Sequence, residues 1–367
     1  MFGTNTSGGV DAGAGWRRQP LGFESYNEVL HFRLYALRFW FEAQTDLRFP
    51  AGGTPNLLRG ALGAAFRRTS CSPACSCPED CPEPGACAYA RLFKPRGEGG
   101  GPSGLVNRPR PFVLRVSHLV EPRTAERHYS VAPCALSVDL DPRTTEREVT
   151  LIPEGSRFHI GVNFFDLRQG AVGELEAALA RLGRDGLGRA VCGQGREGGC
   201  GSAALLSAVE GGLVELPLEP ALDSSDEAGR IAVRFLTPTE LKGETNAGGG
   251  VPSFELLAAR IRDRISTLRA LYGEGPLRID FRGFAERAAR VRTVRAALLR
   301  NAERRTLIRG TRIQDGFLGE VEYEGDLTGF LPYLRAAVYT GVGRQTVWGK
   351  GEIAVDVLDR RKPGWTV

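Results

Sequence analysis

Lysine is scarce in this chain of 367 residues. Only four of its 48 basic residues are lysines, which leaves 44 arginines, and histidine occurs four times. A GC-rich genome produces the same bias, but arginine also stacks on bases and binds phosphates through two parallel hydrogen bonds. The arginine content therefore admits a nucleic-acid ligand without requiring one, and the few histidines limit the choice of general acids and bases.

Long apolar runs are also absent. No stretch approaches the roughly 18 apolar residues of a membrane-spanning helix, so we expect no membrane partner. Residues 1–25 are rich in Gly, Ser and Thr and lack the apolar core of a signal peptide, which predicts a disordered tail. These absences predict a cytoplasmic protein, in which structural disulfides among the eight cysteines are not expected.

The positive charge is unevenly distributed. Residues 253–312 contain 15 arginines and six acidic residues, a net charge of +9. The whole chain carries +5, so the remainder carries −4. A local excess of this kind favours a polyanionic partner.

The first half of the chain alternates strands with two helices. Thr54 and Pro55 suit the N-cap and first position of the first helix, and Gly183 is expected to end the second. The predicted strands cover residues 31–43, 111–116, 147–152, 157–165 and 204–209, and the second helix covers 172–182.

A polar, acidic linker at 217–229 leads to the second half. There we predict strands at 231–236, 317–324 and 353–357, and helices after the N-cap Ser253, at 284–303 and at 328–339. Apart from the helix at 284–303, both halves have the order βαββαβ, which predicts an α+β fold of two tandem ferredoxin-like, RRM-related domains. The expected domains are residues 26–216 and 230–367.

Residues 341–351 form a Gly-x-Gly-x5-Gly-x-Gly loop. Its glycines would let the backbone approach a ligand and expose N–H groups, although a turn without a ligand is the alternative. The loop lacks the Gly-Lys-Ser/Thr of a Walker loop, and it follows a helix, unlike a dinucleotide fingerprint. The predicted contacts to a phosphodiester chain are Gly341, Gly343, Arg344, Gln345, Trp348, Gly349, Lys350 and Gly351.

In four segments, taken in order, the chain resembles a known family. The segments are Leu58-Arg59-Gly60-Ala61-Leu62-Gly63, the stretch from Cys87 through Phe93 to Arg110-Pro111-Phe112, Thr237-Pro238-Thr239, and residues 316–351. The family is that of the CRISPR-associated precursor-RNA processing endoribonucleases, the sixth Cas family of the repeat-associated mysterious protein (RAMP) superfamily. The resemblance implies a CRISPR repeat RNA as ligand, effector-complex subunits as further partners, and a monomer or homodimer.

The resemblance also implies metal-independent cleavage, in which a ribose 2′-OH attacks the adjacent phosphate and leaves a 2′,3′-cyclic phosphate. This chemistry needs a general base, a general acid and a cation. Members of the family often carry a histidine just after the first helix, where this chain has none. The expected catalytic candidates are His118 and His128, followed by Tyr89, Lys94 and Arg96. His31 is expected to be structural, and His159 is expected to be a strand histidine that faces solvent or a partner.

Five cysteines lie within 17 residues, at Cys71, Cys75, Cys77, Cys81 and Cys87. Thiols at this density in a cytosolic protein predict a structural Zn²⁺ site with four of them as ligands. An iron–sulfur cluster and uncoordinated thiols are the alternatives. Cys134, Cys192 and Cys200 are expected to be ordinary thiols.

Three functions follow from the sequence. The first is an endoribonuclease that cuts precursor crRNA, and the second is a non-catalytic crRNA-binding subunit of an effector complex with the same fold. The third is a regulator that depends on zinc or a cluster and binds nucleic acid through its basic face.

Overall fold

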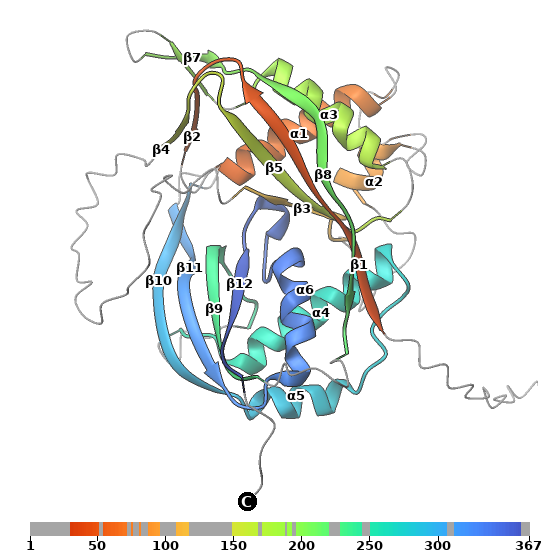
Figure 1. Ribbon diagram of the computed structural model, residues 1–367, viewed down its shortest axis with the longest axis vertical. Helices are drawn as coiled ribbons and strands as arrows, with labels where there is room; N and C mark the ends of the chain where they lie inside the picture. The colour runs from red at the N-terminus through yellow and green to blue at the C-terminus, as the bar shows by residue number, and fades with distance from the viewer. Residues whose placement is uncertain are drawn as a thin grey trace, which may run out of the picture.

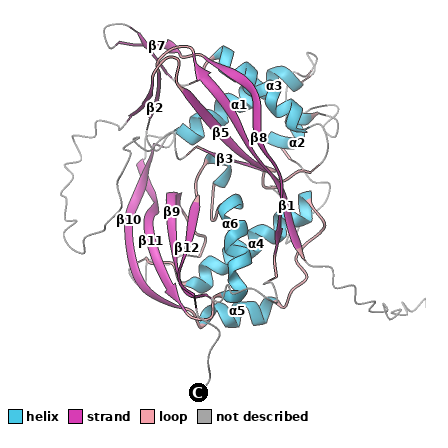
Figure 2. Ribbon diagram, viewed as in Figure 1, coloured by secondary structure: helices cyan, strands magenta, loops and turns pink. Residues whose placement is uncertain are grey.

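The computed structural model is a mixed α/β structure built on antiparallel sheets (Figures 1 and 2). The model describes residues 30–50, 54–71, 75, 81, 87–95, 108–116, 149–167, 171–187, 189–192, 196–219, 228–243, 250–306 and 312–360. Within this described part, no helix combines the length and apolarity needed to cross a bilayer.

The first sheet has the strand order β3(Phe112–Arg115), β5(Arg157–Phe164), β1(His31–Ala43), β8(Ala203–Pro217), with every neighbouring pair antiparallel. The helices α1(Thr54–Ser70) and α3(Ala171–Asp185) cover one face, and the short α2(Ala88–Phe93) lies beside them (Figure 1). Phe39 and Phe41 of β1 share a buried core with Leu58, Leu62 and Phe66 of α1. The helix is thus fixed by the apolar stripe that the sequence shows.

A small additional sheet extends the first half at one end. Its strands are ordered β4(Val149–Ile152), β2(Leu47–Pro50), β6(Arg189–Cys192), β7(Arg196–Cys200). The pair β6 and β7 occupies the glycine-rich stretch that follows α3.

The second sheet has the strand order β10(Arg292–Thr306), β11(Arg312–Glu324), β9(Ala228–Thr239), β12(Ile353–Arg360). Its core includes residues from α4(Phe254–Tyr272), α5(Phe281–Ala289) and α6(Leu331–Thr340). Ser253 caps α4 as predicted, because its side chain accepts a hydrogen bond from the Leu256 N–H. Phe32 and Leu34 of β1 and Phe165 join this second core, so the two halves pack against each other.

Two predicted helix boundaries are wrong. The helix expected at 284–303 ends at Ala289, and residues 292–306 form β10, which pairs along β11. The helix-favouring Ala and Arg residues there are overridden by this pairing, since tertiary context outweighs propensity. Gly183 does not end α3 but lies within it, where a Cβ would approach the Ala203 carbonyl oxygen to 2.3 Å.

With β10 in place of that helix, the second half reads βαββαβ, with α5 following α4. In both large sheets the order is second, third, first, fourth strand of the unit. This arrangement is consistent with ferredoxin-like folds.

Candidate functional site

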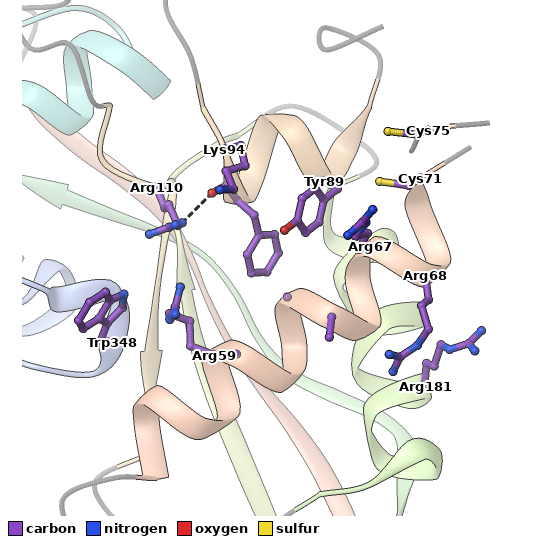
Figure 3. Close-up of a pocket in the computed structure, with 14 residues that line it drawn as sticks. Arg59, Arg67, Arg68, Cys71, Cys75, Tyr89, Lys94, Arg110, Arg181 and Trp348 are labelled. Atoms are coloured by element: carbon purple, nitrogen blue, oxygen red, sulfur yellow. Dashed lines mark hydrogen bonds between the residues drawn. The ribbon is translucent and has the colours of Figure 1, made fainter. Parts of the chain in front are cut away.

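A cleft of about 1010 Å³ lies where α1, α2 and the loop after α6 approach one another (Figure 3). Six of its lining residues are cationic, and none that the structure describes is acidic. The lining comprises Arg59, Gly60, Gly63, Ala64, Arg67, Arg68, Cys71, Cys75, Tyr89, Phe93, Lys94, Arg110, Arg181 and Trp348. Such a wall suits an anionic ligand.

Helix α1 supplies the floor of the cleft. Arg59, Gly63 and Arg67 recur at four-residue spacing, so they share one face of the helix. The small residues between the arginines leave room above the helix. Arg68 is turned toward α3, where it binds Asp185 at 2.7 Å.

At one end of the cleft, Arg59 lies under the indole of Trp348 (Figure 3). The guanidinium carbon is 5.1 Å from the ring centre, a cation–π distance. Burial lowers the pKa of Arg59, and the nearby charge of Arg110 lowers it further. Because no lining acid balances these charges, an anion would stabilise both.

Arg110 is fixed by the end of α2. Its Nε donates a hydrogen bond of 2.8 Å to the Phe93 carbonyl oxygen, and burial lowers the pKa of its guanidinium. The Phe93 ring stacks on Tyr89 at 5.3 Å and packs on Phe112 at 5.2 Å. These contacts fix the positions of Tyr89, Lys94 and Arg110 relative to the first sheet.

The glycines of the loop at 341–351 have a packing role. All four have positive φ, which favours glycine. The N–H groups of Val342, Arg344 and Gly351 donate to the carbonyls of Gly351, Glu240 and Pro238, so these three are used within the fold. A Cβ at Gly349 would meet the Pro55 Cβ at 2.2 Å. The glycines therefore pack the loop onto the fold.

The predicted contact residues of this loop occupy different environments. Lys350 is only 6% exposed, and the Arg344 side chain is bound by Glu240. Gln345 adopts a left-handed φ of 59° and precedes the short 3-10 turn η5(Thr346–Trp348). Trp348, at the end of this turn, is the loop residue that lines the cleft.

The histidines within the described residues lie away from the cleft. His31 Nδ1 is 3.6 Å from a Glu215 carboxylate oxygen, and the His159 ring packs on Trp40 at 4.9 Å. His118, His128 and Arg96 lie outside the described residues. Tyr89 and Lys94 are the catalytic candidates that the structure brings into the cleft.

The cysteine cluster borders the other end of the cleft. Cys71 follows α1, Cys87 precedes α2, and their Sγ atoms are 3.9 Å apart. Burial, the hydrogen bond with Cys87 and nearby thiols raise the pKa of Cys71 to about 12. Cys77 lies outside the described residues, and among those described no three His, Cys, Asp or Glu side chains form a ready metal site.

Sequence reasoning missed most of the cleft. Arg59 and Arg110 lie within the resemblance segments and Arg67 lies in the first predicted helix, but none of the three was predicted as a site residue. None of the described arginines of residues 253–312 lines the cleft. Several of them bind neighbouring acids instead, as Arg295 binds Glu322.

Comparison with known families agrees with this fold. The family model for the CRISPR-associated endoribonuclease Cas6 matches residues 233–353, from β9 to the start of β12. The part of the chain from β9 to the start of β12 therefore matches the Cas6 family. A second model, described as an N-terminal domain, matches residues 32–200, and no curated protein matches.

Solved Cas6 structures are similar over most of this chain. A Cas6 product complex is 17% identical over 88% of this chain and 100% of its own, with a TM-score of 0.44. A Cas6 substrate mimic complex is 19% identical over 89% and 100%, with a TM-score of 0.41. Thermus thermophilus Cas6 is 14% identical over 89% and 99%, with a TM-score of 0.44. At these scores the likeness carries no conclusion about individual residues.

Proposed function

We propose that this chain binds CRISPR repeat RNA in the cleft and cleaves precursor crRNA there. The observation that carries the proposal is the cleft itself, in which cationic side chains and three aromatic rings meet and none of the described lining residues is acidic. Phosphates suit the arginines and bases suit the aromatic faces. The match of residues 233–353 to the Cas6 family model supports RNA processing as the task.

Single-stranded RNA would enter at the end of the cleft where Arg59 and Trp348 meet. A base can stack on an indole, while a neighbouring phosphate binds the guanidinium. The ligand would then extend along α1 toward Arg67. This path brings the RNA backbone past Tyr89 and Lys94.

The proposed reaction is attack of a ribose 2′-OH on the adjacent phosphate. The new P–O bond closes a 2′,3′-cyclic phosphate, the bond to the 5′-oxygen breaks, and a proton moves from the 2′-OH to that leaving oxygen. Arg59 and Arg110 are placed to stabilise the phosphorane charge. Tyr89 and Lys94 are candidates for proton transfer, and His118 and His128 remain candidates on sequence grounds.

Two structural proposals accompany this function. We propose that the two large sheets with their helices are tandem ferredoxin-like domains, joined near residues 217–229. We also propose that four of the cysteines at 71, 75, 77, 81 and 87 bind a structural Zn²⁺. The Sγ separation of Cys71 and Cys87, 3.9 Å, fits two thiolates on one tetrahedral zinc at about 2.3 Å each.

The test is incubation with a CRISPR repeat RNA in excess EDTA. The expected products are one 5′-hydroxyl fragment and one fragment with a 2′,3′-cyclic phosphate. A 2′-deoxy substitution at the scissile nucleotide should abolish cleavage while leaving binding intact. Failure to bind the repeat RNA, or cleavage that depends on Mg²⁺, would contradict the proposal.

A second candidate is a non-catalytic crRNA-binding subunit. The position of His31 and His159 away from the cleft favours it, because the described part of the cleft then offers no histidine for proton transfer. Tight binding of the repeat RNA without cleavage in the same assay would support this alternative.

A further inference from the structure

Three side chains from three different elements meet at the C-terminal end of α6. Arg115 of β3 donates from Nη2 to the carbonyl oxygens of Val338 at 3.0 Å and Tyr339 at 2.9 Å. Asn163 of β5 donates to the Tyr339 carbonyl at 2.8 Å. Arg264 of α4 donates from Nε to the Thr340 carbonyl at 2.9 Å. These carbonyls are among the last four of the helix, which have no partner within it.

The charge at this helix end comes from outside the helix. The last turn of α6 contains no basic residue, although the C-terminal end of a helix favours positive charge. Arg115 and Arg264 supply that charge from the two halves of the molecule.

Two effects disfavour this placement of the arginines: both side chains are buried, and both carry positive charge. Burial and the charge of Arg115 lower the pKa of Arg264 to about 9, and burial lowers the pKa of Arg115 despite the nearby Glu352 carboxylate. Within the described residues, Nη1 of Arg115 and Nη2 of Arg264 have no hydrogen-bond partner. The two arginines bond different carbonyls, and their placement as two desolvated like charges indicates a role beyond capping.

The helix end leads directly to the cleft. Gly341 follows Thr340, and Trp348 follows only eight residues later. In Figure 1 the loop after α6 lies beneath β3, the strand that carries Arg115. Gly349 rests against Pro55 at the start of α1, so a displacement of the helix end would move the loop against α1.

We infer that Arg115, Asn163 and Arg264 are positioning residues that fix the end of α6 and thereby hold Trp348 against Arg59. Arg115 and Asn163 clamp this end to the first sheet, and Arg264 ties it to α4. The two halves are joined at this clamp, and the loop that follows carries the aromatic wall of the cleft. The consequence for RNA rests on the proposed function, whereas the clamp itself does not.

The experiment compares Arg115→Met and Asn163→Ala with wild type by hydrogen–deuterium exchange and by binding of the repeat RNA. Loss of one hydrogen-bonding side chain is expected to speed amide exchange in residues 341–351 and weaken RNA binding, each by about tenfold. Exchange in β9 and β11 should not change. Arg115→Lys, which keeps the charge, should restore part of both effects. Arg335→Met, at an exposed position of α6, is the matched control and should change neither.

The outcomes distinguish the clamp from the proposed RNA-binding function. Unchanged exchange in residues 341–351 in both Arg115→Met and Asn163→Ala overturns the clamp. Faster exchange with unchanged RNA affinity overturns its link to the cleft. If wild type does not bind the RNA, the proposed function fails, and the exchange measurement still decides the clamp. Should Arg115→Met not fold, Asn163→Ala and Arg115→Lys provide the same measurement.

Discussion

The guanidinium of Arg59 lies 5.1 Å from the centre of the Trp348 ring, which joins α1 of the first half to the loop after α6 in the second. This pair unites a cation and an aromatic surface contributed by segments almost 300 residues apart. An RNA bound here would contact both halves at once. The pair is therefore the most direct place to test the cleft.

Replacing Trp348 by alanine should weaken binding of the repeat RNA. Base stacking on an aromatic side chain contributes about 1–3 kcal/mol, so the dissociation constant should rise about 5- to 150-fold. Fluorescence anisotropy with a labelled repeat RNA measures the change. Trp40→Ala is the control, since Trp40 packs on His159 away from the cleft. A loss of affinity in Trp40→Ala alone would place the RNA on the sheet face instead.

Arg67→Gln should reduce the salt dependence of RNA binding. Each phosphate contact on single-stranded RNA contributes about −0.7 to the slope of log K against log salt concentration, so the slope should fall by about that amount. The matched control is Arg282→Gln, which removes the same charge from a side chain that is 90% exposed on α5 and paired with Glu286. Equal slopes for wild type and Arg67→Gln would remove Arg67 from the RNA path.

Local sequence patterns predicted most of the elements but little of the cleft. The N-cap at Ser253 and most of the expected strands depend on neighbouring residues, and the structure has them where they were expected. Residues 292–306 could not be assigned this way, because β10 exists through its pairing with a distant strand. The same limit applies to the cleft, where Arg59, Arg110 and Trp348 meet only through tertiary packing.

The glycine loop shows how far a local motif can be interpreted. Its four glycines have the special backbone geometry that their spacing indicated. Close packing of Gly349 against Pro55 and of Gly343 against Glu240 also requires glycine, and no local pattern reveals these contacts.

The zinc content of the purified protein should test the cysteine cluster. We expect about one zinc ion per purified chain, bound by four thiolates. Cys71→Ser should lose the metal and lower RNA affinity, because Cys71 and Cys87 join the ends of α1 and α2, which carry much of the cleft. Cys192→Ser, in β6, is the control and should keep the metal. Full zinc content in Cys71→Ser would exclude Cys71 as a ligand.

Glu322 should give the fold a dependence on acid pH. Burial alone would raise the pKa of Glu322, but hydrogen bonds from Arg230 and Arg295 outweigh it and lower the pKa below 4.5. Its stabilisation is therefore full above about pH 4.5 and is lost as the pH falls through the folded-state pKa.

Urea unfolding of Glu322→Gln measures this effect. At pH 7 the substitution should lower the free energy of unfolding by about 1.5–3 kcal/mol, and the difference from wild type should shrink in more acidic buffer. Glu324→Gln, which disrupts an exposed pair with Arg292, should cost at most about 1 kcal/mol. A difference that does not depend on pH would show that the Glu322 charge is not responsible.

Gly349→Ala should disturb the cleft through the loop. The added Cβ would lie 2.2 Å from the Pro55 Cβ, and the residue has a φ of 75°, which alanine rarely adopts. We expect a loss of about 1–3 kcal/mol in stability from the strained backbone. RNA affinity should fall as well, because Trp348 precedes this residue.

Gly173→Ala is the control: it lies in α3 with open space around its Cβ position and should gain about 0.5–1 kcal/mol from helix propensity. Wild-type RNA affinity in Gly349→Ala would show that the cleft tolerates movement of the loop, and Trp348 would then have no positioned role in binding.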